Sequence, residues 1–106
     1  MPVKPLTFLG DSRKVLQRLP TNLRRQAGLQ QGYEPDDWKP MATIGPGVRE
    51  IRVRDEAGAF RLIYIAKFLE AVYVLHCFQK KSQQTPAKDI ALSRKRLREL
   101  LEERGS

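Results

Sequence analysis

The sequence predicts an α+β fold: a small antiparallel sheet of about four strands, with an N-terminal αα-hairpin packed on it and a C-terminal helix. Three observations lead to this prediction. Between residues 48 and 78, three runs rich in β-branched and aromatic residues follow one another, separated by compact turns. Two short amphipathic segments precede these runs, and a longer one follows them. With 106 residues, the chain is expected to form a single domain, residues 1–106.

The three central runs are Val48–Arg54, Phe60–Lys67 and Ala71–Phe78. A turn at Asp55–Ala59, which contains a glycine, joins the first two, and a tight connection around Phe68–Glu70 joins the last two. These connections are too short for crossovers, so the runs are predicted to form a meander of antiparallel strands.

The N-terminal part begins with a short apolar run, Val3–Leu9, which Pro5 interrupts. Because proline cannot donate a hydrogen bond to a neighbouring strand, this run is predicted to be an edge strand of the same sheet. Asp11 or Ser12 then caps a first helix that ends at Leu19, before a proline.

A second helix is predicted to begin at Thr21 or Asn22 and to end by Gly32, which completes the αα-hairpin. The segment Tyr33–Pro46 carries three prolines and an acidic pair, so it is predicted to be a loop. Trp38 in this loop either closes the edge of the core or stacks on a base.

The last helix is predicted to begin at Thr85 and Pro86, a hydroxyl N-cap followed by proline at the first helical position. Ile90, Leu97 and Leu101 mark its apolar face. Its basic residues form either a solvated face or a contact for nucleic acid; they are Arg94, Lys95, Arg96 and Arg98.

The chain is strongly basic, with 20 lysines and arginines against 12 acidic residues and a net charge of +8. Such a charge favours nucleic acid, a ribosome-like surface or an acidic protein as partner. One histidine and one cysteine give no metal-ligand spacing, and no glycine-rich phosphate loop is present, so we expect no metal and no other cofactor. Cys77 forms no internal disulfide and is expected to be a small core residue.

No apolar run approaches the ~20 residues that cross a bilayer, and the N-terminus lacks the layout of a signal peptide. We therefore expect a cytoplasmic protein with no membrane partner.

The residues available for chemistry are arginines, lysines and one histidine. This set suits cleavage of RNA by its own 2′-hydroxyl, where the protein positions the strand, neutralises the phosphate and moves protons. Arg52 and Arg54 lie on one face of their strand and form either a phosphate track or an exposed face in which Glu50 is a local partner. Arg61 lies among apolar neighbours, so it is either paired structurally or aimed at a ligand.

Two further candidates lie in and after the third strand. His76 is either a satisfied structural group or a base, since imidazole exchanges protons near neutral pH. Lys80 and Lys81 follow the end of that strand, where binding residues tend to lie, and are predicted to bind phosphate.

Several motifs occur in order along the chain: EIRV in the first strand, AFRLIYI in the second, and VYVLHCFQKKSQQTP leading into the last helix. In these motifs the sequence resembles the phage-derived branch of the RelE/HigB superfamily, the toxins of type II toxin–antitoxin systems. The resemblance implies ribosome-dependent endonucleolytic cleavage of mRNA and neutralisation by a cognate antitoxin of helix-turn-helix type. It also implies site residues. Arg61 would contact the scissile phosphate, Arg52 and Arg54 would orient the RNA, and Lys80 and Lys81 would bind phosphate and contribute to proton transfer.

Two other functions stay open from the sequence. A ParE-type toxin that inhibits DNA gyrase would share the fold but needs no phosphate-cleaving cluster. A non-enzymatic basic module that binds nucleic acid would need only the charge.

Overall fold

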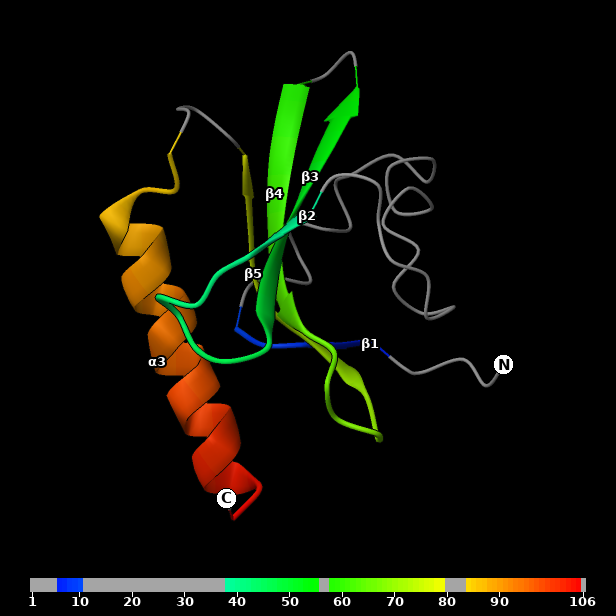
Figure 1. Cartoon of the computed structure of the whole chain (residues 1–106), viewed down its shortest axis with the longest axis vertical. Helices are drawn as coiled ribbons and strands as arrows, with labels where there is room; N and C mark the ends of the chain where they lie inside the picture. The colour runs from blue at the N-terminus through cyan, green and yellow to red at the C-terminus, as the bar shows by residue number, and fades with distance from the viewer. Residues whose placement is uncertain (1–5, 11–37, 56–57, 80–83, 106) are drawn as a thin grey trace.

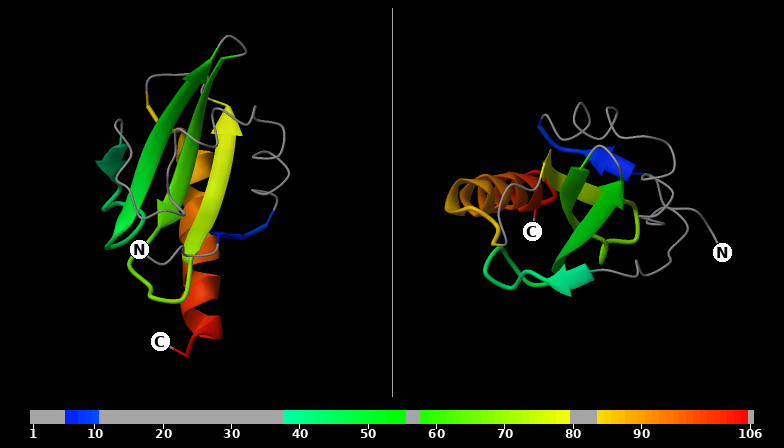
Figure 2. Two further views of the ribbon diagram at one scale, coloured as in Figure 1. Left: turned by 90° about the vertical axis from the view of Figure 1, so that its right-hand side faces the viewer. Right: turned by 90° about the horizontal axis from the view of Figure 1, so that it is seen from above.

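The computed structural model of the chain describes residues 6–10, 38–55, 58–79 and 84–105. Within these ranges the chain forms a five-stranded mixed sheet and one helix, so the α+β prediction is confirmed. The helix lies along one face of the twisted sheet, as the views of Figure 1 and Figure 2 show. The predicted αα-hairpin, from Asp11 to Gly32, lies outside the described residues.

The centre of the sheet is an antiparallel meander of three strands, as predicted. These are β3 (Val48–Asp55), β4 (Gly58–Ile65) and β5 (Val72–Gln79). Asp55 pairs with Gly58 where β3 turns into β4, and residues 66–71 connect β4 to β5. Branched and aromatic side chains fill these strands, and the short connections leave no room for a crossover.

The two outer strands differ from the prediction. The strand order is β1-β5-β4-β3-β2, and β1 (Leu6–Phe8) runs parallel to β5, so the sheet is not wholly antiparallel. A parallel neighbour is possible because the connection from β1 to β5 spans most of the chain. Trp38–Pro40, predicted to be loop, forms β2 at the other edge, where Pro40 needs no further hydrogen-bonded neighbour.

The helix α3 spans Ala87–Glu103, as predicted, but its start differs in one detail. Pro86 is the N-cap residue, and no side chain caps the helix. The backbone N–H groups of Asp89 and Ile90 bond to the carbonyl of Pro86. The hydroxyl of Thr85 bonds to side chains of the sheet instead, because a buried carboxylate lies within its reach.

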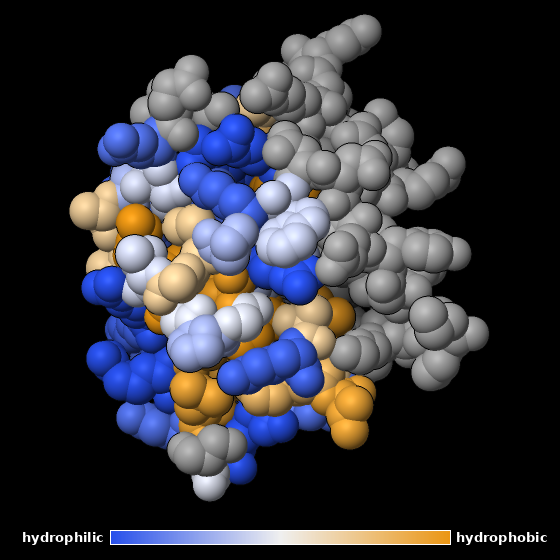
Figure 3. Space-filling view, in the orientation of Figure 1, coloured by the Kyte–Doolittle hydropathy of each residue, from blue (hydrophilic) through white to orange (hydrophobic). Residues whose placement is uncertain are grey.

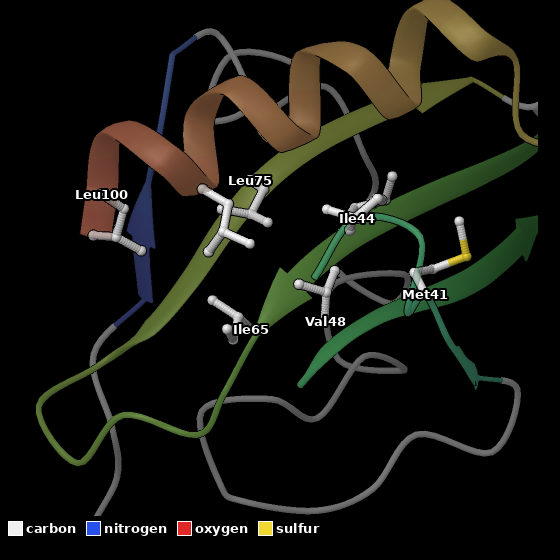
Figure 4. Packing of buried hydrophobic residues seen from close by; sticks show 8 residues of the cluster. Met41, Ile44, Val48, Ile65, Leu75 and Leu100 are labelled. Atoms are coloured by element: carbon white, nitrogen blue, oxygen red, sulfur yellow. The ribbon is translucent and has the colours of Figure 1, made fainter. Parts of the chain in front are cut away.

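Apolar side chains are buried on both faces of the sheet. On the face toward α3, Val48, Ile65 and Leu75 belong to one buried cluster that also includes Leu100 of the helix (Figure 4). The other face carries a second cluster made of Ile51, Leu62, Tyr64, Val72, Val74 and Cys77. Burial on both faces explains why β4 reads as a nearly continuous apolar run rather than an alternating one. No helix in the described ranges is long and apolar enough to cross a membrane.

A β-bulge in β5 determines which side chains reach α3. Ile63 pairs with His76 and Tyr64 pairs with Val74, so Leu75 is an extra residue. Strict alternation would place Leu75 and His76 on opposite faces. The bulge turns His76 to the same face as Leu75, the face that α3 covers.

Candidate functional site

Polar side chains are buried where the first half of α3 crosses the sheet. In the described part of the chain, the buried polar residues are contributed by β3, β4, β5 and the first two turns of α3. Such groups are seldom buried unless hydrogen-bonded or paired, so their partners define what this region does. They are Glu50, Arg61, His76, Asp89 and Ser93.

The first group, here called the Glu50 cluster, consists of Glu50, Arg61 and Thr85. Nη1 of Arg61 lies 3.4 Å from Oε1 of Glu50, and both side chains are 0% exposed. Nη1 of Arg61 also donates to the Thr85 hydroxyl at 2.6 Å, and that hydroxyl donates to Oε2 of Glu50 at 2.5 Å. The three groups therefore join β3, β4 and the segment that enters α3.

A buried ion pair is tolerated only when further polar contacts compensate the loss of water. Thr85 supplies one such contact, and Nζ of Lys39 adds another positive charge 3.8 Å from Oε1 of Glu50. The Lys39 side chain is 42% exposed, so the cluster approaches solvent on the β2 side. In this arrangement the guanidinium of Arg61 lies beneath the surface.

The second group connects β5 to α3 through His76. Its Nε2 lies 2.7 Å from Oδ1 of Asp89, and its ring stacks on Phe78 with centroids 5.0 Å apart. Nη1 of Arg96 lies 3.4 Å from Nδ1 of His76 and donates to the carbonyl of Leu75 at 2.8 Å.

These partners favour one tautomer of the imidazole. A guanidinium only donates, so Nδ1 of His76 faces Arg96 as an acceptor, and we assign the ring proton to Nε2, which donates to Asp89. A general base needs a ring nitrogen within reach of the proton that it removes. Both nitrogens of His76 are engaged here, and the geometry favours its role as a structural link.

Arg52 differs from these buried groups. It lies directly opposite Arg61 across β3 and β4, and it is half-exposed. It makes no ion pair with any residue whose side chain the structure describes. Because like charges directly opposite each other repel, this cross-strand pair is tolerated only when one charge is neutralised. Glu50 neutralises Arg61, which leaves Arg52 as the cation at the surface of the cluster.

The structure describes the other predicted site residues only in part or not at all. Arg54 pairs with Ala59 in the strand register, and only its backbone is described. Lys80 and Lys81 lie outside the described residues, directly after the end of β5 at Gln79.

Three further polar residues of the region were not predicted. Thr85 was predicted only as a helix cap, while Asp89 and Arg96 lie among charged residues that the sequence places on a helix surface. The best signal for Asp89 is its position one turn before Ser93, whose hydroxyl donates to its carbonyl and which lies on the same helix face.

The alternatives left open for Trp38 and for the basic run of α3 are partly resolved. Trp38 packs against the core, and the guanidinium of Arg49 lies 4.1 Å from the centre of its ring, so it closes the edge of the core. Arg94 donates to the carbonyl of Thr43 at 2.6 Å, so this charge helps to fasten α3 to the loop after β2. Cys77 is a buried free thiol in the core, as expected.

A third polar group, at Arg104 and Glu70, fastens the C-terminal end of α3. Arg104 makes two hydrogen bonds to the carboxylate of Glu70, at 3.0 and 3.2 Å, and lies 3.9 Å from the centre of the Phe68 ring. The Tyr73 hydroxyl donates to the same carboxylate at 2.9 Å. A hydrogen bond from its own backbone N–H, and then those from Tyr73 and Arg104, hold the pKa of Glu70 below its ordinary 4.5. Burial, and then Glu70, raise the pKa of Tyr73 above its ordinary 10.0.

The described residues contain no group of three His, Cys, Asp or Glu side chains that could hold a metal ion. The region instead offers the partly exposed guanidinium of Arg52 beside the Arg61 guanidinium, which the buried carboxylate of Glu50 neutralises. Such an arrangement is suited to binding an anion with the geometry of a phosphate.

Comparison with known proteins identifies a family. A family profile described as phage derived protein Gp49-like matches residues 14–98, which is most of the chain. A search of curated proteins gave no significant match. The profile agrees with the phage-derived branch that the strand motifs indicate. The chain therefore belongs to the phage-derived Gp49-like family, a family of RelE/HigB-like toxins in toxin–antitoxin systems.

Proposed function

We propose that the chain is the toxin of a type II toxin–antitoxin system and that it cleaves mRNA on the ribosome, with the 2′-hydroxyl of the substrate as nucleophile. Family membership supports the assignment as a toxin. The observation that supports cleavage is the cross-strand pair of Arg52 and Arg61. Glu50 neutralises the guanidinium of Arg61, and that of Arg52 has no such counter-ion among the described side chains.

In this proposal Arg52 contacts the phosphate that is cleaved. A phosphate gains negative charge as the 2′-oxygen attacks, and a guanidinium fixed beside it stabilises that charge more in the transition state than in the ground state. Arg61 acts from beneath as a positioning residue. Its contacts with Glu50 and Thr85 fix β4 and the start of α3 relative to the strand that carries Arg52.

The other predicted site residues have supporting roles in this proposal. Arg54 is two residues beyond Arg52 on β3 and extends the contact with RNA. Lys80 and Lys81, which follow β5, bind phosphate and contribute to proton transfer. His76 keeps α3 on the sheet through Asp89 rather than moving protons itself.

The partners in this proposal are the ribosome with its mRNA, and a cognate antitoxin, which the family suggests. A net charge of +8 on 106 residues favours an acidic antitoxin surface. We propose an antitoxin of helix-turn-helix type encoded beside the toxin.

The experiment is primer-extension mapping of transcripts after induction of the wild-type chain and of Arg52→Ala. The wild type is expected to give discrete cuts at fixed positions within translated codons. Arg52→Ala is expected to reduce the cleavage rate about 100-fold, the typical cost of removing a donor that stabilises transition-state charge. Arg49→Ala is the matched control, because Arg49 lies on the same strand but on the opposite face, over Trp38.

Three results would decide against the proposal. Equal cleavage by the wild type and Arg52→Ala would exclude Arg52 from the reaction. Intact transcripts together with DNA damage would identify a gyrase inhibitor of the ParE type. Intact transcripts and intact DNA, with RNA still bound, would identify a binding module without catalysis.

A further inference from the structure

The outer face of α3 carries a stripe of cations. Lys88, Lys95 and Arg98 are exposed, and with the exposed Ala91 they follow the spacing 3, 4, 3 that places residues on one side of a helix. At 1.5 Å per residue, the stripe from Lys88 to Arg98 is about 15 Å long. Hydrophilic side chains lie along the left edge of the molecule in Figure 3, where α3 runs.

Among the residues whose side chains are described, these cations make no contact that fastens α3 to the sheet. Arg94 and Arg96, from the same basic run, bond to backbone carbonyls of the β2–β3 loop and of β5. Lys88, Lys95 and Arg98, in contrast, make no ion pair with any residue whose side chain the structure describes. The basic residues of α3 thus form two sets. Arg94 and Arg96 are hydrogen-bonded to the rest of the fold, whereas Lys88, Lys95 and Arg98 are exposed and can contact a partner.

Several of the exposed charges along α3 are placed in the less favourable order for helix stability. Lys88 lies in the first turn, near the positive end of the helix dipole, although Asp89 in the same turn has the favourable sign; the last turn has no basic residue, and Arg104 follows it as the C-cap. Lys95 precedes Glu99 by four residues, and Arg98 precedes Glu102 by four, the less favourable order for such pairs. The positions of Lys88, Lys95 and Arg98 therefore contribute little to the stability of α3, which leaves these cations available for binding.

We propose that this stripe, Lys88, Lys95 and Arg98, binds the phosphate backbone of RNA, and that it docks the toxin on ribosomal RNA. The second part rests on the proposed function. A partner protein would require an apolar or aromatic anchor at the centre of the contact, and the only apolar side chain within the stripe is that of Ala91. Flexible cations around a small residue suit a row of phosphates, which needs charge but no pocket. The acidic residues of the last turn repel the same backbone and so limit the contact to the first two-thirds of α3.

The test measures RNA binding by the full chain and leaves cleavage aside. Affinity for an RNA duplex of about 20 base pairs and for 70S ribosomes is measured between about 50 and 300 mM salt. The triple variant Lys88→Gln/Lys95→Gln/Arg98→Gln is expected to lower the slope of log K against log salt by about 2 to 3, and to weaken binding roughly 100-fold near 0.15 M salt. The control removes three cations outside the stripe and has the same net charge; it carries Arg49→Gln, Lys67→Gln and Arg104→Gln.

A slope and affinity equal to those of the wild type would overturn the inference, as would an equal loss in the control variant. So would a loss confined to binding of the antitoxin, which would assign the stripe to an acidic protein. If the wild type binds RNA through the stripe but leaves transcripts intact, the proposed cleavage fails and the docking stands.

A second measurement separates binding from a structural role. Lys88→Glu places a negative charge at the start of α3, so it is expected to raise the melting temperature while it weakens RNA binding. A lower melting temperature for Lys88→Glu would show that Lys88 supports the fold, and would remove it from the stripe.

Discussion

Removing the buried carboxylate of the Glu50 cluster tests whether Arg61 is held by charge. Glu50→Gln keeps nearly the same shape but leaves the Arg61 guanidinium buried without its counter-ion, because both side chains are 0% exposed in the wild type. Breaking a buried ion pair by removing one partner costs about 3–5 kcal/mol. A domain of this size has a free energy of unfolding of about 5–15 kcal/mol, so the change removes about a fifth of it or more.

The assay is urea unfolding of the full chain, followed by circular dichroism. With a urea dependence of about 2 kcal/mol per molar, the midpoint is expected to fall by about 1.5–2.5 M. The double variant Glu50→Leu/Arg61→Met replaces the whole pair by apolar groups of similar size. Because such replacements are often neutral or stabilising, its midpoint is expected to return close to that of the wild type.

Two results would refute the reasoning about this pair. One is a loss below about 1 kcal/mol for Glu50→Gln, which would mean that solvent already compensates the charge. The other is a double variant whose loss equals the sum of the single losses, which would show that the two residues do not interact. If the double variant folds, its cleavage rate also shows whether the charge of Arg61 contributes to the reaction.

Two further predictions concern the ends of α3. Asp89→Ala leaves Nε2 of His76 buried without its acceptor and is expected to lower the free energy of unfolding in urea by about 1–3 kcal/mol. The control Glu99→Gln, on the exposed face of α3, is expected to change the free energy of unfolding by no more than about 0.5 kcal/mol. Since the folded state lowers the pKa of Glu70, its contribution to stability is present above the ordinary 4.5 and is lost as the pH falls through the lower folded value. Melting temperature against pH should therefore fall less steeply below 4.5 for Glu70→Gln than for the wild type, and equal slopes would contradict the shift.

The sequence by itself determined the elements whose causes are local. The strands β3, β4 and β5 follow from runs of branched and aromatic residues and from short connections between them. The helix α3 follows from its amphipathic spacing, and the basic character of the chain follows from a count of residues. These features depend on neighbours within a few positions, which a single sequence displays directly.

The edges of the sheet depended on contacts that are distant in the sequence. The three residues of β2 become a strand because β3 offers an open edge, and Trp38 finds a place against the core there. The direction of β1 depends on which strand it meets at the far side of the sheet, and that strand is more than 60 positions later. Propensity alone contains no information on either pairing.

The candidate site was decided almost wholly by the tertiary structure. The sequence places Arg61 among apolar neighbours and Arg52 on a more open face, but only the tertiary structure pairs the buried Arg61 with Glu50 and leaves Arg52 partly exposed. Thr85 contacts Arg61 from 24 positions away along the chain, and the bulge in β5 turns His76 toward α3. The physical reason is that the state of a charged side chain depends on its counter-ion and its burial, and both are properties of the assembled fold.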